Sequence, residues 1–453
     1  MTELADLVSG VLDHAIGQEE VEAYAVHSIS TTIQADTDAT IRQIGRAETR
    51  GIGIRVIRDG RLGYASTSDL DPVALRITVE RARGNAAASD PDEAQELPAP
   101  LISQTFQASD GLLVPGFEVV RLADKIGLVV DLARRVVSLD PRVSALDTAE
   151  YHDEQRTVAV ASTRGVRVVH QVGYVELWVD ALGEDQGARA SDYAYQFRRS
   201  LASCQPEPLA ARAVERTLRL LGPITPHRPG IPVVLDPHVV ADLLTAVGKG
   251  LSGGPVSSGR TPFADQSGAV VAAACVNLAD DGRSPTSSAA ATFDDEGVSR
   301  RRTQLIDNGV LVGALHSTVT ARAARSRAGS TGNARRASHK SVPRAAPTCL
   351  VLKPTTSLTN LMSDLAEVVY IQQLSGSSAG INPVTGRIDV GGIGWLLQAG
   401  QPVGRVETIA ISTNLTAFLR SIVAIGDDAD QVPFTPTAAS TVVCDSELIH
   451  PSR

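Results

Sequence analysis

The sequence predicts an α+β protein with two unlike halves. The first half alternates long β-branched runs of strand character with long helical segments, and the second half has shorter strand-like runs separated by turn-rich loops. A chain of 453 residues exceeds one ordinary hydrophobic core. We therefore predict an N-terminal α/β domain over 1–222, with antiparallel strands and long helices, and a C-terminal domain over 223–453 that is mainly antiparallel β with a few helices.

Composition limits the class of protein. Hydrophobic residues make up 43% and charged residues 21%, which is typical of a globular protein in water. The net charge of −9 disfavours general binding to nucleic acid or anionic membranes. The N-terminus lacks the basic and apolar blocks of a signal peptide, and the most apolar run, 268–279, is too short to cross a bilayer. We expect a cytoplasmic protein without membrane association.

The cysteines agree with that compartment. Cys204, Cys275, Cys349 and Cys444 are scattered along the chain, and no two form a C-x-x-C pair. Such spacing is typical of free thiols in a reducing cytoplasm and gives no zinc-binding pattern.

The elements of the first half follow from periodicity and turn residues. Asp59-Gly60 predicts a tight hairpin turn, and Thr163–Gly165 predicts another. Prolines mark an exposed connector over 91–106. We expect helices at 4–18, 70–88, 117–138 and 209–221, strands at 20–34, 40–47, 52–57 and 62–66, and further strands across 143–198.

The second half begins after a proline-rich linker, 222–232, with a helix over 236–252. Asp236 can cap its free N–H groups, Pro237 suits the first helical turn, and glycines end it. Asn308-Gly309 predicts a hairpin within 303–315. We also expect a strand at 269–278, a loop at 375–386, antiparallel strands over 388–411 with a turn near residue 400, a helix at 415–425 and a last strand at 440–444.

Two charged segments are candidates for function. Asp294, Asp295 and Glu296 could form a metal or acid/base cluster, or an acidic turn paired with Arg300–Arg302. The turn is favoured, because adjacent side chains on a strand face opposite ways. The segment Arg300–Arg344 holds nine Arg and one Lys against the single acid Asp307. It could bind a substrate carboxylate, an acidic partner or nucleic acid, or form a solvated face; the lack of interleaved aromatic residues disfavours base stacking.

Several segments together resemble the TldD/TldE (PmbA) family of metallopeptidase-related proteins, called modulators of DNA gyrase in older naming. They occur in the family's order and span both halves of the chain. The matching segments are RAETRGIGIRVIRDGRLGYAST over 46–67, VLDPHVVADLLTAVGKGLSG over 234–253, FDDEGVSRRRTQLIDNGVLVGAL over 293–315, STGNARR over 330–336, NPVTG over 382–386 and AIGDD over 424–428.

The resemblance separates two kinds of subunit. The catalytic kind, TldD, carries HExxxH on the helix that matches 236–252, and its His residues and a distant Cys hold zinc. In this chain Leu244 stands at the first His, Thr245 at the Glu and Lys249 at the second His. Leucine has no donor atom, threonine is no base near neutral pH, and a protonated lysine repels a cation. The chain therefore resembles the TldE type, with no catalytic residue and no metal ligand of its own.

The resemblance implies a partnership. TldD- and TldE-type subunits form a heterodimer that encloses a chamber, in which unfolded peptide reaches the single zinc of the TldD-type partner. We expect this chain to be a catalytically inactive partner subunit that supplies part of the chamber wall and of the peptide groove, for proteolysis or peptide maturation. Its candidate contacts with substrate or partner are Arg260, Arg300, Arg301, Asn333, Arg335 and Arg336.

Two alternatives remain open on the residues. One is a self-sufficient hydrolase whose nucleophile would lie among Ser257, Ser258 and Cys275, although no His–acid arrangement singles one out. The other is a DNA- or gyrase-binding modulator that acts through Arg300–Arg344. Neither the substrate nor the choice between housekeeping turnover and maturation of a secondary metabolite follows from the sequence.

Overall fold

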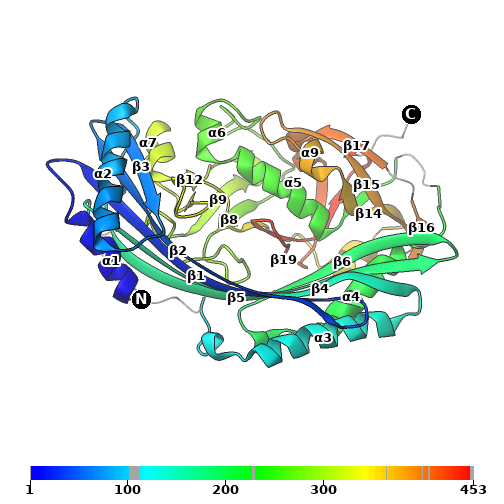
Figure 1. The fold of residues 1–453 in the computed structure, drawn as a ribbon. Helices are drawn as coiled ribbons and strands as arrows, with labels where there is room; N and C mark the ends of the chain where they lie inside the picture. The colour runs from blue at the N-terminus through cyan, green and yellow to red at the C-terminus, as the bar shows by residue number, and fades with distance from the viewer. Residues whose placement is uncertain are drawn as a thin grey trace.

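A curved six-stranded antiparallel sheet forms the base of the molecule in the computed structural model (Figure 1). The structure describes residues 2–100, 112–226, 230–363, 365–399, 401–406 and 409–448. The strand order is β3-β2-β1-β4-β5-β6, and every neighbouring pair is antiparallel. The strands are β1 (Glu20–Ala35), β2 (Ile41–Arg58), β3 (Arg61–Thr67), β4 (Val143–Ser162), β5 (Arg167–Asp185) and β6 (Ala188–Arg198).

Four helices cover the outer, convex face of this sheet. The alternation of side chains along β1 sends Ala23 and Ala25 into a core with α1 and α2, and Ile33 into a core with α3 and α4. Asp71 caps α2 by accepting the N–H of Val73. The helices are α1 (Thr2–Leu12), α2 (Pro72–Ala88), α3 (Leu122–Leu139) and α4 (Pro206–Arg219), with short 3₁₀ turns at Phe117–Val119 and Leu201–Ser203.

Most elements predicted for the first half are confirmed, with three corrections. Residues 40–47 and 52–57 belong to one long strand, β2, because its ladder with β1 continues through Gly51 and Gly53. The first helix ends at Leu12, and the helix predicted over 117–138 is interrupted between the 3₁₀ turn and α3. The hairpin turn at Asp59-Gly60 is confirmed by φ angles of 52° and 72°.

The connector predicted to be exposed over 91–106 is partly buried. Leu97 is fully buried, and its backbone N–H donates to Glu20 Oε2 at 2.8 Å, which ties the connector to β1. Residues 101–106 of that prediction lie outside the described residues. The prolines thus mark a segment that crosses a surface while one apolar side chain enters the core.

The second half holds two larger sheets with helix α5 (Pro237–Gly250) between them. Helix α5 packs against β14 of one sheet and β20 of the other, and its apolar stripe joins a single core. The first sheet has the order β16-β15-β14-β7-β21-β18, with β17 beside β15, and the second has the order β10-β9-β8-β13-β20-β19. A further pair, β11–β12, is antiparallel. The β14–β7 and β13–β20 pairs are parallel and the other pairs are antiparallel.

The bounds of these elements are as follows. The strands are β7 (Val233–Leu235), β8 (Leu278–Asp281), β9 (Arg302–Asp307), β10 (Val310–Leu311), β11 (Ala334–Arg335), β12 (Arg344–Ala345), β13 (Leu350–Leu352), β14 (Glu367–Ser375), β15 (Arg387–Gln398), β16 (Gln401–Arg405), β17 (Ile409–Asn414), β18 (Ile422–Ile425), β19 (Asp430–Gln431), β20 (Thr437–Ala439) and β21 (Val442–Cys444). The remaining helices are α6 (Gly253–Ser257), α7 (Thr318–Ala323), α8 (Leu358–Ser363), α9 (Ser377–Gly380), α10 (Leu415–Ser421) and a 3₁₀ turn at Ser446–Leu448.

The α+β prediction is confirmed, and so is the β9–β10 hairpin, where Asn308 and Gly309 have φ angles of 46° and 81°. The strand predicted at 269–278 is wrong: the segment is irregular, and strand structure starts only with β8. The helix predicted at 415–425 ends at Ser421, because the last four residues pair with β21 as β18. The turn predicted near residue 400 lies at a position outside the described residues. The division at 222/223 stays a prediction.

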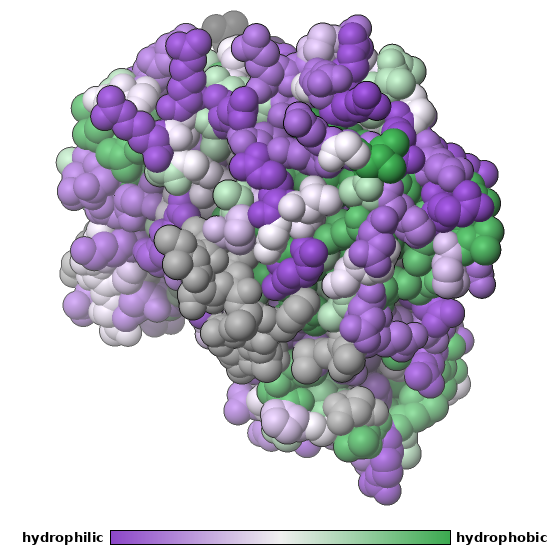
Figure 2. All heavy atoms as spheres, turned by 90° about the vertical axis from the view of Figure 1, so that its left-hand side faces the viewer, coloured by the Kyte–Doolittle hydropathy of each residue, from purple (hydrophilic) through white to green (hydrophobic). Residues whose placement is uncertain are grey.

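The surface of the molecule is mixed. Figure 2 shows the face on which α1, α2 and α7 lie; hydrophilic residues cover most of it, and hydrophobic residues form separate patches. Among the described residues, no helix has the length and apolarity needed to pass through a membrane. All four cysteines are free thiols.

Helix α2 lies so close to β3 that only glycine fits at position 63. A Cβ at Gly63 would collide with the carbonyl oxygen of Ala82 and the backbone N of Ala86. We predict that Gly63→Ala lowers the free energy of unfolding by about 1–3 kcal/mol through overpacking.

The control is Gly84→Ala on the same helix, where an added Cβ meets nothing within 4 Å. It should raise stability by about 0.5–1 kcal/mol, because alanine has the higher helix propensity. Chemical denaturation measures both variants, and equal effects would contradict the close packing of α2 on β3.

Candidate functional site

Helix α5 carries the three positions that the resemblance relates to a zinc motif. Leu244 is fully buried in the core of the second half, and Thr245 is half-buried with its Oγ1 3.4 Å from Thr437 Oγ1. Lys249 is exposed in the last turn. These side chains offer a hydrocarbon, a hydroxyl and an ammonium group, so they do not fit a zinc ion, which binds thiolate, imidazole and carboxylate ligands.

The nearest histidine on this helix has a structural role. His238 Nδ1 lies 3.1 Å from Arg216 Nη2, and its ring stacks on Tyr193 with centroids 4.7 Å apart. Burial lowers the pKa of His238 to about 3. Within the described ranges, no group of three or more His, Cys, Asp or Glu side chains is placed to hold a metal.

A buried ionic cluster joins the two halves of the chain. Arg55 on β2 binds Glu22 on β1 through Nε and Nη2, and its Nη1 lies 3.0 Å from Oε1 of Glu296 in the loop before β9. Arg336 binds Glu22 from the segment after β11. The exposed fractions of these residues are 0% for Glu22, 2% for Arg55, 1% for Glu296 and 5% for Arg336. Four charges are thus removed from water and satisfied by one another.

The carboxylates of 294–296 have three different sets of partners. Asp294 accepts backbone N–H groups, including that of Ala334 at 3.0 Å, and Asp295 accepts the N–H of Arg336 at 2.6 Å. Glu296 accepts from Arg55 and from the N–H of Thr318. The favoured turn is confirmed, but the expected pairing with Arg300–Arg302 is wrong, because the salt-bridge partner comes from β2.

The structure corrects part of the predicted contact set. Arg300 is 5% exposed and donates to the carbonyls of Phe293 and Ala289, and Asn333 is 1% exposed and donates to Asp280 Oδ2 at 2.6 Å. With Arg336 in the ionic cluster, these three side chains lie inside the molecule and present no surface to a ligand. Arg260, Arg301 and Arg335 are exposed, and their contact with substrate or partner stays a prediction.

Arg301 lines a cavity of about 500 Å³ beside the C-terminal end of α5, together with Leu251 and His316. Its Nη2 donates to the carbonyl of Ser330 at 2.7 Å. The cavity therefore places one of the three exposed arginines next to the helix that matches the family's metal segment.

The candidate nucleophiles are held by backbone groups. Ser257 Oγ donates to the carbonyl of Gly253 at 2.7 Å, and Ser258 Oγ donates to that of Gly254 at 2.8 Å. Cys275 Sγ donates to the carbonyl of Ile422, and burial raises the pKa of this thiol. None of these contacts supplies the base that a serine or cysteine nucleophile needs.

The inner, concave face of the first sheet is polar and aromatic outside the apolar cluster of Val26, Val158 and Val160, and we call this polar part the trough. Glu22 and Tyr24 face the second half, so the even-numbered β1 residues and their cross-strand partners lie on this face. Ser28 and Tyr174 both donate to Glu154, at 2.6 and 2.7 Å. The half-buried side chains of β4, β5 and β6 in the trough include Thr148, Glu150, His152, Glu154, Arg156, Tyr174, Glu176, Trp178, Asp180 and Tyr193.

No sequence signal identified the trough, because its members are alternate residues of four strands. A helix motif or a charge run is local in sequence, whereas Glu150 meets Gln34 across more than a hundred residues. Only the register between strands brings these side chains onto one face.

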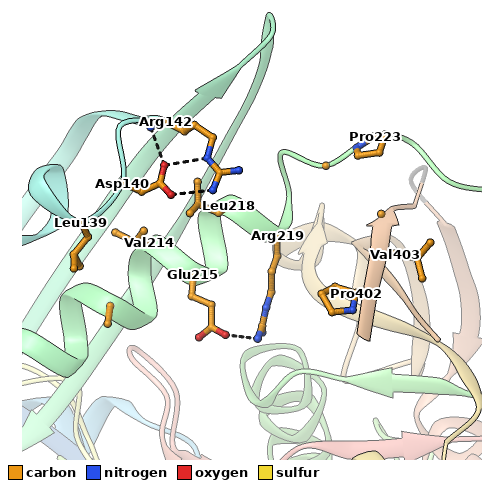
Figure 3. Close-up of a pocket in the computed structure, with 13 residues that line it drawn as sticks. Leu139, Asp140, Arg142, Val214, Glu215, Leu218, Arg219, Pro223, Pro402 and Val403 are labelled. Carbon is orange, nitrogen blue, oxygen red and sulfur yellow. Dashed lines mark hydrogen bonds and ion pairs between the residues drawn. The ribbon is translucent and has the colours of Figure 1, made fainter. Parts of the chain in front are cut away.

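A second cavity lies at the junction of α3, α4 and β16 (Figure 3). It has a volume of about 530 Å³. Its charged residues are already paired, Asp140 with Arg142 and Glu215 with Arg219, and apolar side chains such as Val403 complete the lining. This arrangement provides an apolar cleft without a free acid, base or nucleophile.

Sequence comparison defines the class of protein to which this fold and site correspond. Models of the PmbA/TldA metallopeptidase match in three consecutive parts: domain 1 over residues 21–86, the central domain over 115–221 and the C-terminal domain over 229–449. The chain belongs to the PmbA/TldD metallopeptidase family.

Individual relatives cover nearly the whole chain. Metalloprotease PmbA of Escherichia coli O157:H7 is 24% identical over 98% of this chain and 94% of its own length, and an uncharacterized protein of Methanocaldococcus jannaschii is 26% identical over 81% of this chain and 82% of its own length. Among solved structures, TldE from Thermococcus kodakarensis has a TM-score of 0.85 at 20% identity and 98% coverage of both chains. A candidate modulator of DNA gyrase from Thermotoga maritima has a TM-score of 0.86 at 23% identity, covering 98% of this chain and 99% of its own. These structures share the fold.

The ionic cluster gives a test of how the two halves are joined. We predict that Arg55→Met lowers the free energy of unfolding by about 3–5 kcal/mol, because it leaves Glu22 and Glu296 buried without their cation. The control is Arg76→Met in the exposed Arg76–Glu80 pair, which should change stability by less than about 0.5 kcal/mol. Urea denaturation measures both, and a small effect for Arg55→Met would contradict the role of the cluster.

A buried histidine predicts a pH dependence of stability. His170 on β5 is 4% exposed, its Nδ1 has no hydrogen-bond partner, and burial lowers its pKa to about 3. The unfolded chain binds a proton at this residue below about pH 6.5, and the folded protein does not, so stability falls as the pH drops below that value. At pH 5 the loss from His170 should be about 2 kcal/mol.

The measurement compares wild type with His170→Gln by thermal and urea denaturation at pH 7.5 and pH 5.0. The variant should lose less stability than wild type between the two pH values, whatever its stability at pH 7.5. Identical losses in the two proteins would contradict a neutral His170 in the folded state.

Proposed function

We propose that this chain is the TldE-type, non-catalytic subunit of a heterodimer with a TldD-type zinc peptidase, and that it forms part of the chamber wall and of the peptide groove. The observation that carries the proposal is α5, where Leu244, Thr245 and Lys249, at the positions that the resemblance relates to the zinc motif, offer no zinc ligand. None of the nine histidines in the chain is followed by glutamate, so HExxxH does not occur in the sequence.

The shape of α5 supports the same proposal. A Cβ at Gly248 would meet Pro347 and Leu350, and one at Gly250 would meet Thr261 and Phe263, so the glycines let the helix pack closely. The helix keeps a close-packed geometry, while Leu244, Thr245 and Lys249 offer no zinc ligand. That combination fits a subunit that contributes structure to a heterodimer, while the partner subunit carries the catalytic zinc site.

The first sheet offers surface for an extended peptide. Residues 41–50 of β2 pair with β1, whereas β3 pairs with β2 only from Ile52 onward. An open strand edge can pair with a peptide backbone by hydrogen bonds. Such bonds recognise the extended conformation of the peptide more than its sequence. In the partner, a bound zinc ion would polarise water or the scissile carbonyl. This chain would hold and orient the peptide.

The experiment measures zinc and hydrolysis separately. The purified chain should contain substoichiometric zinc and cleave no unfolded peptide, and cleavage should appear when a TldD-type chain with intact HExxxH is added. Replacing the Glu of that partner motif with Gln should abolish cleavage, because it removes the base that activates water. The matched double variant Thr245→Ala/Lys249→Ala of this chain should leave the activity of the pair unchanged.

Three results would overturn the proposal. One equivalent of zinc retained by the purified chain would show a metal site of its own. Cleavage by the chain alone in excess chelator would show a self-sufficient hydrolase. Loss of activity in the Thr245→Ala/Lys249→Ala variant, with assembly intact, would show that these positions take part in the reaction.

A further inference from the structure

Phe434 is a large aromatic residue whose side chain lies outside the hydrophobic core. It lies in the short loop between β19 and β20, which Figure 1 shows above the curved first sheet. Its side chain is 92% exposed, and its φ angle of 58° is in the left-handed region that bulky residues rarely adopt. Its ring centroid lies 5.6 Å from that of Trp178 in the trough.

The loop holds this ring in place. The side-chain amide of Gln431 donates to the carbonyls of Val432 and Thr435, at 3.1 and 2.9 Å, and Pro433 and Pro436 restrict the backbone on either side. A left-handed backbone at a non-glycine residue is unfavourable and persists only where its surroundings fix it. The loop's own contacts therefore hold the ring in position while most of its surface stays open to solvent.

Phe434 begins a row of aromatic rings. Trp178 stacks on Tyr193 with centroids 4.2 Å apart and an angle of 9° between the rings, and Tyr193 stacks in turn on His238. Tyr193 and His238 line a cavity of about 230 Å³ that also contains the carboxylate of Asp242. The row therefore leads from the trough to a small cavity with Asp242 in its lining.

The charge around the row is negative. Glu176 and Asp180 flank Trp178 on the same face of β5, and Glu150 lies directly opposite Trp178 on β4. Two arginines lie nearby and both have acidic partners: Arg216, which contacts His238 of the row, lies between Asp192 and Asp236, and Arg212 lies 4.0 Å from Asp430.

The carboxylate of Asp180 is not fully hydrogen-bonded. Its Oδ1 is buried without a hydrogen-bond partner. Burial, together with Asp147 and Asp192, raises the pKa of Asp180 to about 6. A carboxyl group in this state is stabilised in its charged form by any cation that comes close.

We propose that Phe434 and Trp178, with Glu176 and Asp180 beside them, form a subsite for a cationic side chain, lysine or arginine, of an extended peptide in the trough. The proposal rests on the function proposed above, in which unfolded peptide lies between the two subunits. The open face of an aromatic ring attracts a cation, and the neighbouring carboxylates add charge complementarity. The subsite thus selects basic peptide segments over acidic ones.

The experiment uses the isolated full-length chain, so that it does not depend on the zinc subunit. A blocked Gly-Ser peptide with three spaced lysines is titrated by calorimetry against the same peptide with norleucine in their place. The lysine peptide should bind at least about threefold more tightly, as one desolvated cation–π contact implies, and added salt should weaken its binding. Its binding should also change the emission of half-exposed Trp178, whereas Trp395 is buried.

Variants of Phe434 separate a cation–π contact from simple apolar contact. Phe434→Leu keeps an apolar side chain but loses the ring, and should weaken binding of the lysine peptide by about threefold to thirtyfold. Phe434→Trp should keep it, and Asp180→Asn should weaken it. Because the side chain is exposed, the melting temperature of the Phe434 variants should not fall.

Three outcomes would overturn the subsite. The first is equal affinity for the lysine and norleucine peptides, and the second is wild-type binding by Phe434→Leu. The third is normal peptide binding by Phe434→Ala with loss of assembly with a TldD-type chain, which would make the ring a contact for the partner subunit. Each can occur while the zinc and hydrolysis results stand, so the two proposals fail separately.

Discussion

The guanidinium of Arg55, buried between Glu22 and Glu296, is the interaction on which the arrangement of the two halves depends. Two carboxylates from different halves share one cation, and Arg336 closes the cluster on Glu22. Any displacement of the second half at this point would leave a charge in a region without water, at a cost of several kcal/mol. The cluster therefore fixes the position of the two halves relative to each other more than it increases the free energy of unfolding.

Local signals in the sequence predicted local structure well. The cap and proline of α5, the Asp59-Gly60 turn and the Asn308-Gly309 turn each lie within a few residues of the structure they specify. The failures are long-range. Residues 422–425 have the same apolar character as the helix before them, and only the ladder with β21 makes them a strand.

The candidate site shows the same limit more strongly. Arg300 and Arg336 belong to a run of positive charge that looks like a surface, yet the carboxylates and carbonyls that bury them come from distant segments. A count of charges along the chain cannot distinguish a solvated arginine from one that ties two loops together. The chemical character of Leu244, Thr245 and Lys249 could be predicted directly, because the comparison with a zinc motif requires only the order of residues along one helix.

A second buried ionic group stands at the other end of the sheet, where Arg216 of α4 joins Asp192 of β6 to Asp236 at the start of α5. The pairing of the strands shows that the two groups lie far apart along the sheet. Glu22 pairs with Ser162 at the last residue of β4. Asp192 pairs with Ala181, which lies opposite Leu146 near the start of β4, beyond the end of β1. Two separated anchors restrain the halves against sliding and against every relative rotation except one about the line that joins the two ionic groups. Any other relative motion of the halves would pull a buried charge away from its partner, so the distance between the trough and the second half is set by two ion pairs that lie outside the trough.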